Sequence, residues 1–145
     1  MKRYAISACL MGENCKYNGG NNMDTNLVAY MRDKAYITIC PEILGGLTIP
    51  RTCCEIRAGR VVDKNGSDVT EAFIKGAQLA IKQIKAYEVD IVIVQPRSPS
   101  CGKGKIYDGN FENQLIDGNG IFVDMLIKEG LQVMNLEEFH NLTKM

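Results

Sequence analysis

The most constraining feature of this 145-residue chain is a short apolar strand that follows an amphipathic helix. Residues 90–95 read DIVIVQ, and such a run is typical of a strand buried on both faces of a parallel sheet. Residues 70–87 carry apolar side chains at helical spacing, with Asp68 or Thr70 as the cap. A helix leading into a doubly buried strand is part of a β-α-β unit, so this segment favours an α/β fold.

The remaining segments continue the alternation of strands and helices. Further strands are predicted at residues 3–7, 35–39 and 132–134, and further helices after Asp24, over 120–129 and from Glu137. Alternation around Ala58-Gly59 predicts a small β-hairpin arm over 55–62, and residues 96–119 are expected to form a polar loop. In the helix at 120–129 we expect Ile121, Met125 and Leu126 to face inward.

These elements predict one three-layer α/β domain spanning residues 1–145. Its centre would be a mostly parallel four-stranded sheet with helices on both faces, and the hairpin arm would project from it. The N-terminal residues lack the apolar core of a signal peptide, and no apolar run reaches transmembrane length. We therefore expect a cytoplasmic protein with no membrane partner.

Charge and composition restrict the expected partners. Lys plus Arg and Asp plus Glu each number 17, so the formal net charge is zero. A neutral chain offers no electrostatic argument for binding nucleic acid, and a small molecule is the expected partner. A homodimer is only the default expectation for the oligomeric state.

Six cysteines are more than packing requires in a chain of this length. In a reducing compartment they indicate metal, cluster or thiol chemistry rather than disulfides, although some would be ordinary buried side chains. Cys9 and Cys15 follow the first strand, Cys40 ends the second, and Cys101 follows the DIVIVQ strand. Because ligands bind outside the carboxyl ends of parallel strands, these four should converge. An all-sulfur ligand set suits zinc or an iron–sulfur cluster, and both remain open from spacing alone.

Four motifs, in order along essentially the whole chain, resemble a known family. They are SACLMG with CKYNG (7–12 and 15–19), CPEILGGL with PR (40–47 and 50–51), DVT with GA (68–70 and 76–77), and SPSCG with IYDG and GNG (98–102, 106–109 and 118–120). Together they are similar to the thiouracil desulfurase family, long classed as a domain of unknown function.

The resemblance implies a cofactor and a reaction. It implies a [4Fe–4S] cluster held by Cys9, Cys15 and Cys101, with one open iron that binds the substrate sulfur. Such a cluster is easily lost in air. The implied reaction is non-redox removal of sulfur from 2-thiouracil or a related thiolated base or small thio-compound. Glu42 matches the family's acidic residue beside the cluster, and Ser98 or Ser100 its serine.

The implied roles agree with the chemistry of these side chains. An open iron is a Lewis acid that polarises a C=S bond toward attack by water. Glu42 would serve as general base for that water or as proton donor to the ring, and a serine would orient the water or the base. Tyr17 and Tyr107 are candidates to line the pocket, and Arg51 is expected to form an ion pair or anchor a loop.

Other readings stay open at this point. Cys40 could be a core residue near the cluster, or it could complete a closed four-cysteine site in a non-enzymatic metal- or cluster-binding module. A third hypothesis is a redox or persulfide enzyme that uses cysteine thiols without a metal, but the chain has no C-x-x-C motif. Asn18 replaces an aspartate common in the family, and Cys53-Cys54 stands where relatives carry prolines. This vicinal pair is expected to pack locally or to have no role, and a sulfur relay through a persulfide on one of the two is the alternative.

Overall fold

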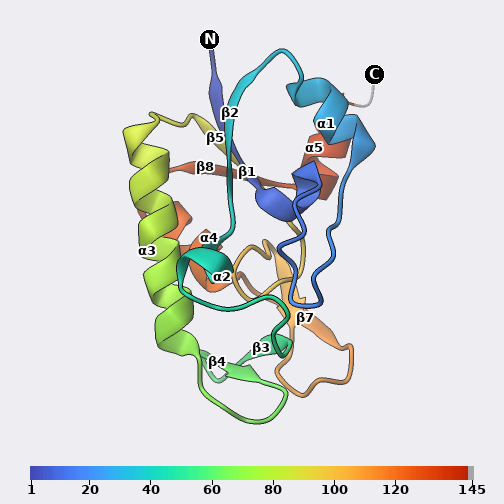
Figure 1. The fold of residues 1–145 in the computed structure, drawn as a ribbon, viewed down its shortest axis with the longest axis vertical. Coiled ribbons are helices and arrows are strands. Elements are labelled where there is room, and N and C mark those ends of the chain that lie inside the picture. Colours follow the sequence, from blue (N-terminus) through green and yellow to red (C-terminus); the bar gives the residue numbers. More distant parts are fainter. Residues whose placement is uncertain (144–145) are drawn as a thin grey trace.

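The computed structural model, which describes residues 1–143, is built around a four-stranded parallel sheet (Figure 1). The strand order is β2-β1-β5-β8, and every neighbouring pair is parallel. The strands are β1 (Arg3–Ser7), β2 (Ala35–Ile39), β5 (Ile91–Val94) and β8 (Gln132–Asn135). Each lies within one residue of its predicted bounds, so the α/β class and the parallel sheet are confirmed.

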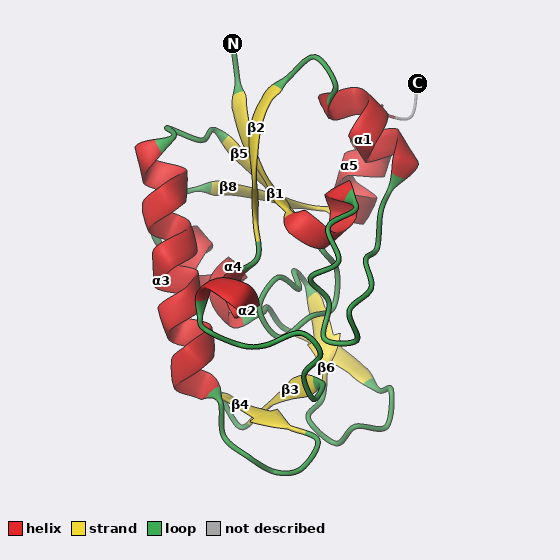
Figure 2. Ribbon diagram, in the orientation of Figure 1, coloured by secondary structure: helices red, strands yellow, loops and turns green. Residues whose placement is uncertain are grey.

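Helices cover both faces of this sheet (Figure 2). One face packs against α3 (Thr70–Ala86) and α4 (Ile121–Lys128). The other packs against α1 (Thr25–Met31), α5 (Leu136–Thr143) and the short 3₁₀ helix η1 (Ala8–Met11). Side chains along each strand alternate between the two cores, which is why the β5 sequence is apolar throughout. The predicted three-layer arrangement is therefore confirmed.

Polar side chains accept backbone hydrogen bonds at the starts of α1 and α3, but only α1 has a side-chain cap. Asp24 Oδ1 accepts a hydrogen bond from the Leu27 amide at 2.9 Å and caps α1. Before α3, Asp68 Oδ1 accepts a hydrogen bond from the Thr70 backbone amide at 2.9 Å. The Thr70 hydroxyl oxygen accepts a hydrogen bond from the Val61 backbone amide at 2.8 Å. The N-cap residue of α3 is Val69, which makes no side-chain cap hydrogen bond, so neither Asp68 nor Thr70 is the cap that was predicted. No helix among residues 1–143 is long and apolar enough to cross a membrane.

Two small antiparallel hairpins lie beyond the carboxyl ends of the central strands, in the lower half of Figure 1. The first pairs β3 (Cys54–Arg57) with β4 (Arg60–Asp63) and confirms the predicted arm. The second pairs β6 (Lys105–Tyr107) with β7 (Leu115–Asp117) inside the segment 96–119 that was expected to be loop. That expectation was wrong because three-residue strands, with β7 fully exposed, are too short to show an alternating pattern.

One further expectation needs correction, and one short helix was not anticipated. Leu126 is completely buried and Met125 packs against the same core, as predicted, but the core also takes Phe122 and Val123 in place of Ile121, which is only half-buried. This helix is apolar on most sides, so its sequence period could not fix the inward face. The chain after β2 also continues into a short helix, α2 (Pro41–Leu44), with proline at its first position.

The order of the strands creates a crevice between β1 and β5. From β1 the chain crosses through α1 to β2 on one side, and it returns through α3 to β5 on the other side. The loops that follow β1 and β5 therefore leave the sheet in opposite directions. In open α/β sheets such a switch point is the usual position of a ligand site.

Candidate active site

A cavity of about 490 Å³ opens at this switch point, at the carboxyl ends of β1, β2 and β5. All six cysteines line it, although they come from segments as far apart as residues 9 and 101. Glu42, Ser98 and Ser100 line it too. The structure thus brings together every site residue predicted from the sequence.

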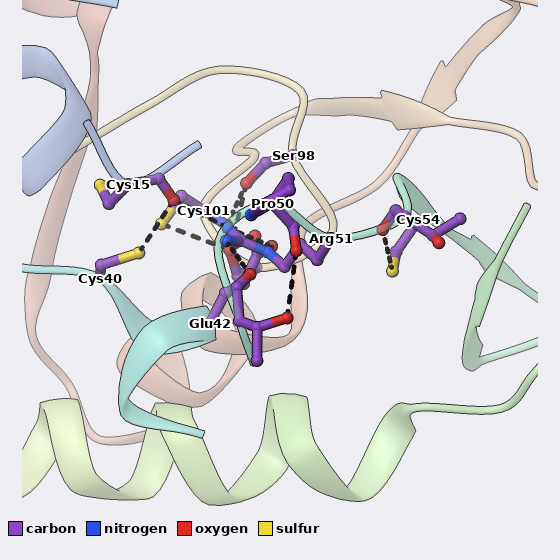
Figure 3. Close-up of polar contacts among 11 residues, drawn as sticks. Cys15, Cys40, Glu42, Pro50, Arg51, Cys54, Ser98 and Cys101 are labelled. Atoms are coloured by element: carbon purple, nitrogen blue, oxygen red, sulfur yellow. Dashed lines mark hydrogen bonds and ion pairs between the residues drawn. The ribbon is translucent and has the colours of Figure 1, made fainter. Parts of the chain in front are cut away.

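Strand ends position the four central cysteines. Cys9 lies in η1 directly after β1, Cys15 in the loop that follows, and Cys101 in the loop after β5; all three are buried. Cys40 is half-buried at the start of α2, and its Sγ lies 4.0 Å from the Cys15 carbonyl oxygen. Cys15, Cys40 and Cys101 lie near one another in Figure 3, with Cys54 set apart from them.

The thiols of Cys15 and Cys101 are held in their neutral form. Burial raises the pKa of Cys101 to about 12, although the Ser7 and Ser100 hydroxyls oppose that shift. The pKa of Cys15 is raised to about 11: its contact with Cys40 lowers it, but its contact with Cys9 and burial outweigh that effect. A metal centre bound here would have to displace these protons.

The arrangement of the cysteines distinguishes between two kinds of metal centre. Among residues 1–143, no three His, Cys, Asp or Glu side chains are grouped closely enough to hold a single metal ion. In a cubane cluster each thiolate binds a different iron, so its ligands stand farther apart than those of one ion. Three buried thiols around a cavity of this size therefore fit an iron–sulfur cluster better than a mononuclear zinc site.

Glu42 is fixed by contacts to both carboxylate oxygens (Figure 3). It lies in the first turn of α2. Arg51 donates to its Oε1 from Nε at 3.2 Å and from Nη2 at 3.1 Å. Ser100 Oγ donates to its Oε2 at 2.8 Å. The same Arg51 donates to the carbonyl oxygens of Cys15 and Thr48, so it joins Glu42 to the cysteine loop and matches the ion-pair role expected for it.

The two candidate serines make different contacts. Ser100 is buried and binds Glu42, whereas Ser98 Oγ accepts the Cys101 amide at 2.7 Å and lies 3.3 Å from Ser100 Oγ. The loop that carries both serines is held by the first backbone amides of α4. The Ile121 N–H donates to the Pro99 carbonyl oxygen, and the Phe122 N–H donates to the Ser100 carbonyl oxygen. Ser100 is thus placed beside the carboxylate, and Ser98 fixes the backbone of Cys101.

Sequence reasoning gave no role to Ser7 or Gln95. Ser7 is the last residue of β1, and its Oγ accepts a hydrogen bond from the backbone N–H of Gln95 at 3.0 Å. This bond connects the carboxyl ends of β1 and β5. Both line the cavity. The available signal was their position, because each stands at the carboxyl end of a strand flanking the switch point.

The structure also locates the residues that depart from the family pattern. Asn18 is not among the residues that line the cavity, and its Oδ1 accepts the Gly20 amide in a local turn. Cys53 and Cys54 line the cavity, a location that local packing alone does not require. Tyr17 and Tyr107 line it as well, as expected.

Comparisons with known proteins agree with this arrangement. A family model described as 2-thiouracil desulfurase matches residues 5–138. The chain is 33% identical to the uncharacterized protein YbbK of Bacillus subtilis (strain 168), over 94% of this chain and 97% of that protein. A solved structure titled [4Fe-4S]-dependent thiouracil desulfidase TudS superposes with a TM-score of 0.89 at 32% identity, and all of both chains is covered.

Proposed function

This chain belongs to the 2-thiouracil desulfurase family, and from that premise we propose that it is an iron–sulfur-dependent enzyme that removes sulfur from 2-thiouracil or a related thiolated base. The observation that carries the proposal is the cavity in which the buried thiols meet the Glu42–Ser100 pair. The family match confirms the resemblance inferred from the four motifs.

Cys9, Cys15 and Cys101 are the proposed ligands of a [4Fe–4S] cluster. They are the three buried cysteines, and their loops flank the switch point. Cys40 is less buried, and its thiol is directed at the Cys15 carbonyl, so we assign it a place beside the cluster rather than a ligand role. When bound, such a cluster supplies an iron without a protein ligand that takes up the substrate sulfur and polarises the C=S bond.

The net reaction is a hydrolysis. Water supplies the oxygen of the new C=O bond, sulfur leaves as sulfide, and no electrons are gained or lost overall. The protein must therefore accept a proton from the attacking water and return one to the departing group. Glu42 is the group that we assign to this transfer.

The two oxygens of Glu42 have different tasks in this assignment. Arg51 occupies Oε1 with two N–H groups and holds the carboxylate in place. From residues 1–143, Oε2 accepts only the Ser100 hydroxyl, so it keeps a lone pair for the attacking water. Ser100 orients this oxygen and can exchange a proton with it, and Ser98 Oγ lies 3.3 Å from Ser100 Oγ.

The decisive experiment is anaerobic reconstitution with iron and sulfide. Iron and sulfide content, visible absorption and electron paramagnetic resonance would define the cluster, and uracil and sulfide release would be followed with 2-thiouracil as substrate. We expect one cluster per chain and stoichiometric release of both products. The Glu42→Gln variant should bind the same cluster and turn over about 100-fold or more slowly.

Two results would contradict the proposal. A full cluster without turnover would remove the enzymatic function. A cluster with four cysteine ligands, lost when Cys40 is replaced, would instead indicate a closed, non-enzymatic binding module.

A further inference from the structure

The third of the four sequence motifs, which contains Gly76 and Ala77, contributes no residue to the lining of the cavity. Gly76 is buried in the interior of α3, a position where alanine would favour the helix more than glycine does. The short helix α2 lies beside α3 in Figure 1. A glycine that weakens a long helix at such a position indicates that another segment of backbone comes very close to it.

The backbone that approaches Gly76 is the single turn of α2. A Cβ atom at position 76 would lie 1.7 Å from the Pro41 carbonyl oxygen and 2.8 Å from the Gly45 backbone nitrogen. These two atoms are joined by a hydrogen bond of 2.9 Å that spans the turn. One turn earlier in α3, the Ala72 carbonyl oxygen would lie 2.1 Å from a Cβ atom added to Gly45. The two helices therefore meet backbone against backbone at two points.

The same turn of α2 carries Glu42, whose carboxylate is held by residues outside both helices. Ser100 belongs to a loop fixed by α4, and Arg51 is anchored to the Cys15 carbonyl oxygen, so neither would follow α2 if it moved. Real Cβ atoms essentially never come within 3.0 Å of other heavy atoms, so a methyl group at position 76 would displace α2 by more than about 1 Å. The 2.8 Å contact between Glu42 and Ser100 cannot absorb a shift of that size.

We propose that Gly76 is a positioning residue for the proposed general base, and that it holds Glu42 in place by letting α2 rest directly on the backbone of α3. This inference rests on the proposed function and deepens it, because it gives a role to the motif that does not reach the cavity. Misplacing a catalytic group by about 1 Å lowers a rate by about 100-fold. Cys9, Cys15 and Cys101 lie on other elements, so cluster binding does not depend on Gly76.

The test adds a methyl group at the contact and asks whether Glu42 and Ser100 are still coupled. Gly76→Ala and Gly45→Ala each place a Cβ atom against the other helix, and Gly45→Ala, with the milder clash, is the second variant if Gly76→Ala does not fold. Each is also combined with Ser100→Ala. The control is Ile84→Val, a buried change about two turns further along α3 that lowers stability without adding an atom.

In the reconstituted enzyme, we expect Gly76→Ala to lower kcat about 10- to 100-fold, with KM changed less than about threefold and iron content unchanged. Ser100→Ala should lower kcat of the unchanged enzyme and cause no further loss in the Gly76→Ala background. Ile84→Val should lower the urea midpoint and leave kcat unchanged. An unchanged kcat in Gly76→Ala, equal effects of Ser100→Ala in both backgrounds, or the same loss of kcat in Ile84→Val would overturn the inference.

Urea unfolding of the cluster-free proteins separates this inference from the proposed function. Ser100→Ala removes a donor from the largely buried Glu42 carboxylate and should lower the urea midpoint of the unchanged chain. In the Gly76→Ala background the same change should shift the midpoint much less. That result, with no sulfide release from the unchanged enzyme, would support the positioning role and remove the desulfurase function. Equal shifts in both backgrounds would overturn the positioning role even if desulfuration is observed.

Discussion

Arg51 and Glu42 form a buried ion pair in which the arginine also holds the loop that carries Cys15. Arg51 Nη2 lies 3.1 Å from Glu42 Oε1, and the two side chains are only 8% and 15% exposed. The same nitrogen donates to the Cys15 carbonyl at 2.9 Å. One guanidinium therefore fixes both the proposed catalytic carboxylate and the backbone of a proposed cluster ligand.

Replacing Arg51 by methionine should destabilise the protein by about 3 kcal/mol, because Glu42 would remain buried without its partner. Arg51→Lys should lower the stability less than Arg51→Met does, because lysine keeps the positive charge but loses the two-pronged contact with Glu42. Urea unfolding of the cluster-free protein measures both effects. The double variant Arg51→Met with Glu42→Gln should recover much of the loss, and additive losses would argue against direct coupling.

The two serines of the SPSCG motif should have separable effects. Ser100→Ala removes the hydrogen bond to Glu42 and should lower kcat about tenfold or more while the cluster loads normally. Ser98→Ala removes the acceptor of the Cys101 amide and should mainly reduce iron content and stability. Steady-state kinetics normalised to bound iron separates the two. If both variants lose only iron, Ser100 has no part in proton transfer.

The sequence predicted the central elements because their pattern has one physical solution. The DIVIVQ strand must be covered on both faces, and its bounds were correct within one residue. The hairpin formed by β6 and β7 was missed because its strands depend on each other and on packing against the arm rather than on a local pattern. The buried face of α4 was predicted only at Met125 and Leu126, because Ile121, Phe122 and Val123 are all strongly apolar and the sequence does not distinguish them.

The site residues that could be predicted from the sequence are those at strand ends and in the four motifs. Cys9 and Cys101 converge because β1 and β5 are neighbours, which the α/β pattern anticipates. Arg51 was expected to form an ion pair, but its partner depends on how the loop after α2 folds back.

Single replacements of cysteine by serine should divide the six residues into two classes. Cys9→Ser, Cys15→Ser and Cys101→Ser should each lose most of the bound iron, since each removes one of the proposed ligands. Cys40→Ser, Cys53→Ser and Cys54→Ser should retain it and serve as matched controls in the same cavity. Iron content and visible absorption after anaerobic reconstitution provide the measurement. Iron loss in Cys40→Ser equal to that in Cys101→Ser would indicate a four-cysteine site.

The cluster-free protein should lose stability at alkaline pH, and Cys54 should contribute part of this loss. Burial, with the Glu42 and Asp63 carboxylates adding to it, raises the pKa of Cys54 to about 12 from 9.0. Because the folded pKa is above the unfolded one, the contribution is complete below pH 9 and disappears as the pH rises toward 12. Allowing for partial solvation, about 1–2 kcal/mol should be lost between pH 8 and 11. Urea unfolding with reductant at both pH values should show a smaller decline for Cys54→Ala than for Cys53→Ala, and equal declines would contradict the assignment.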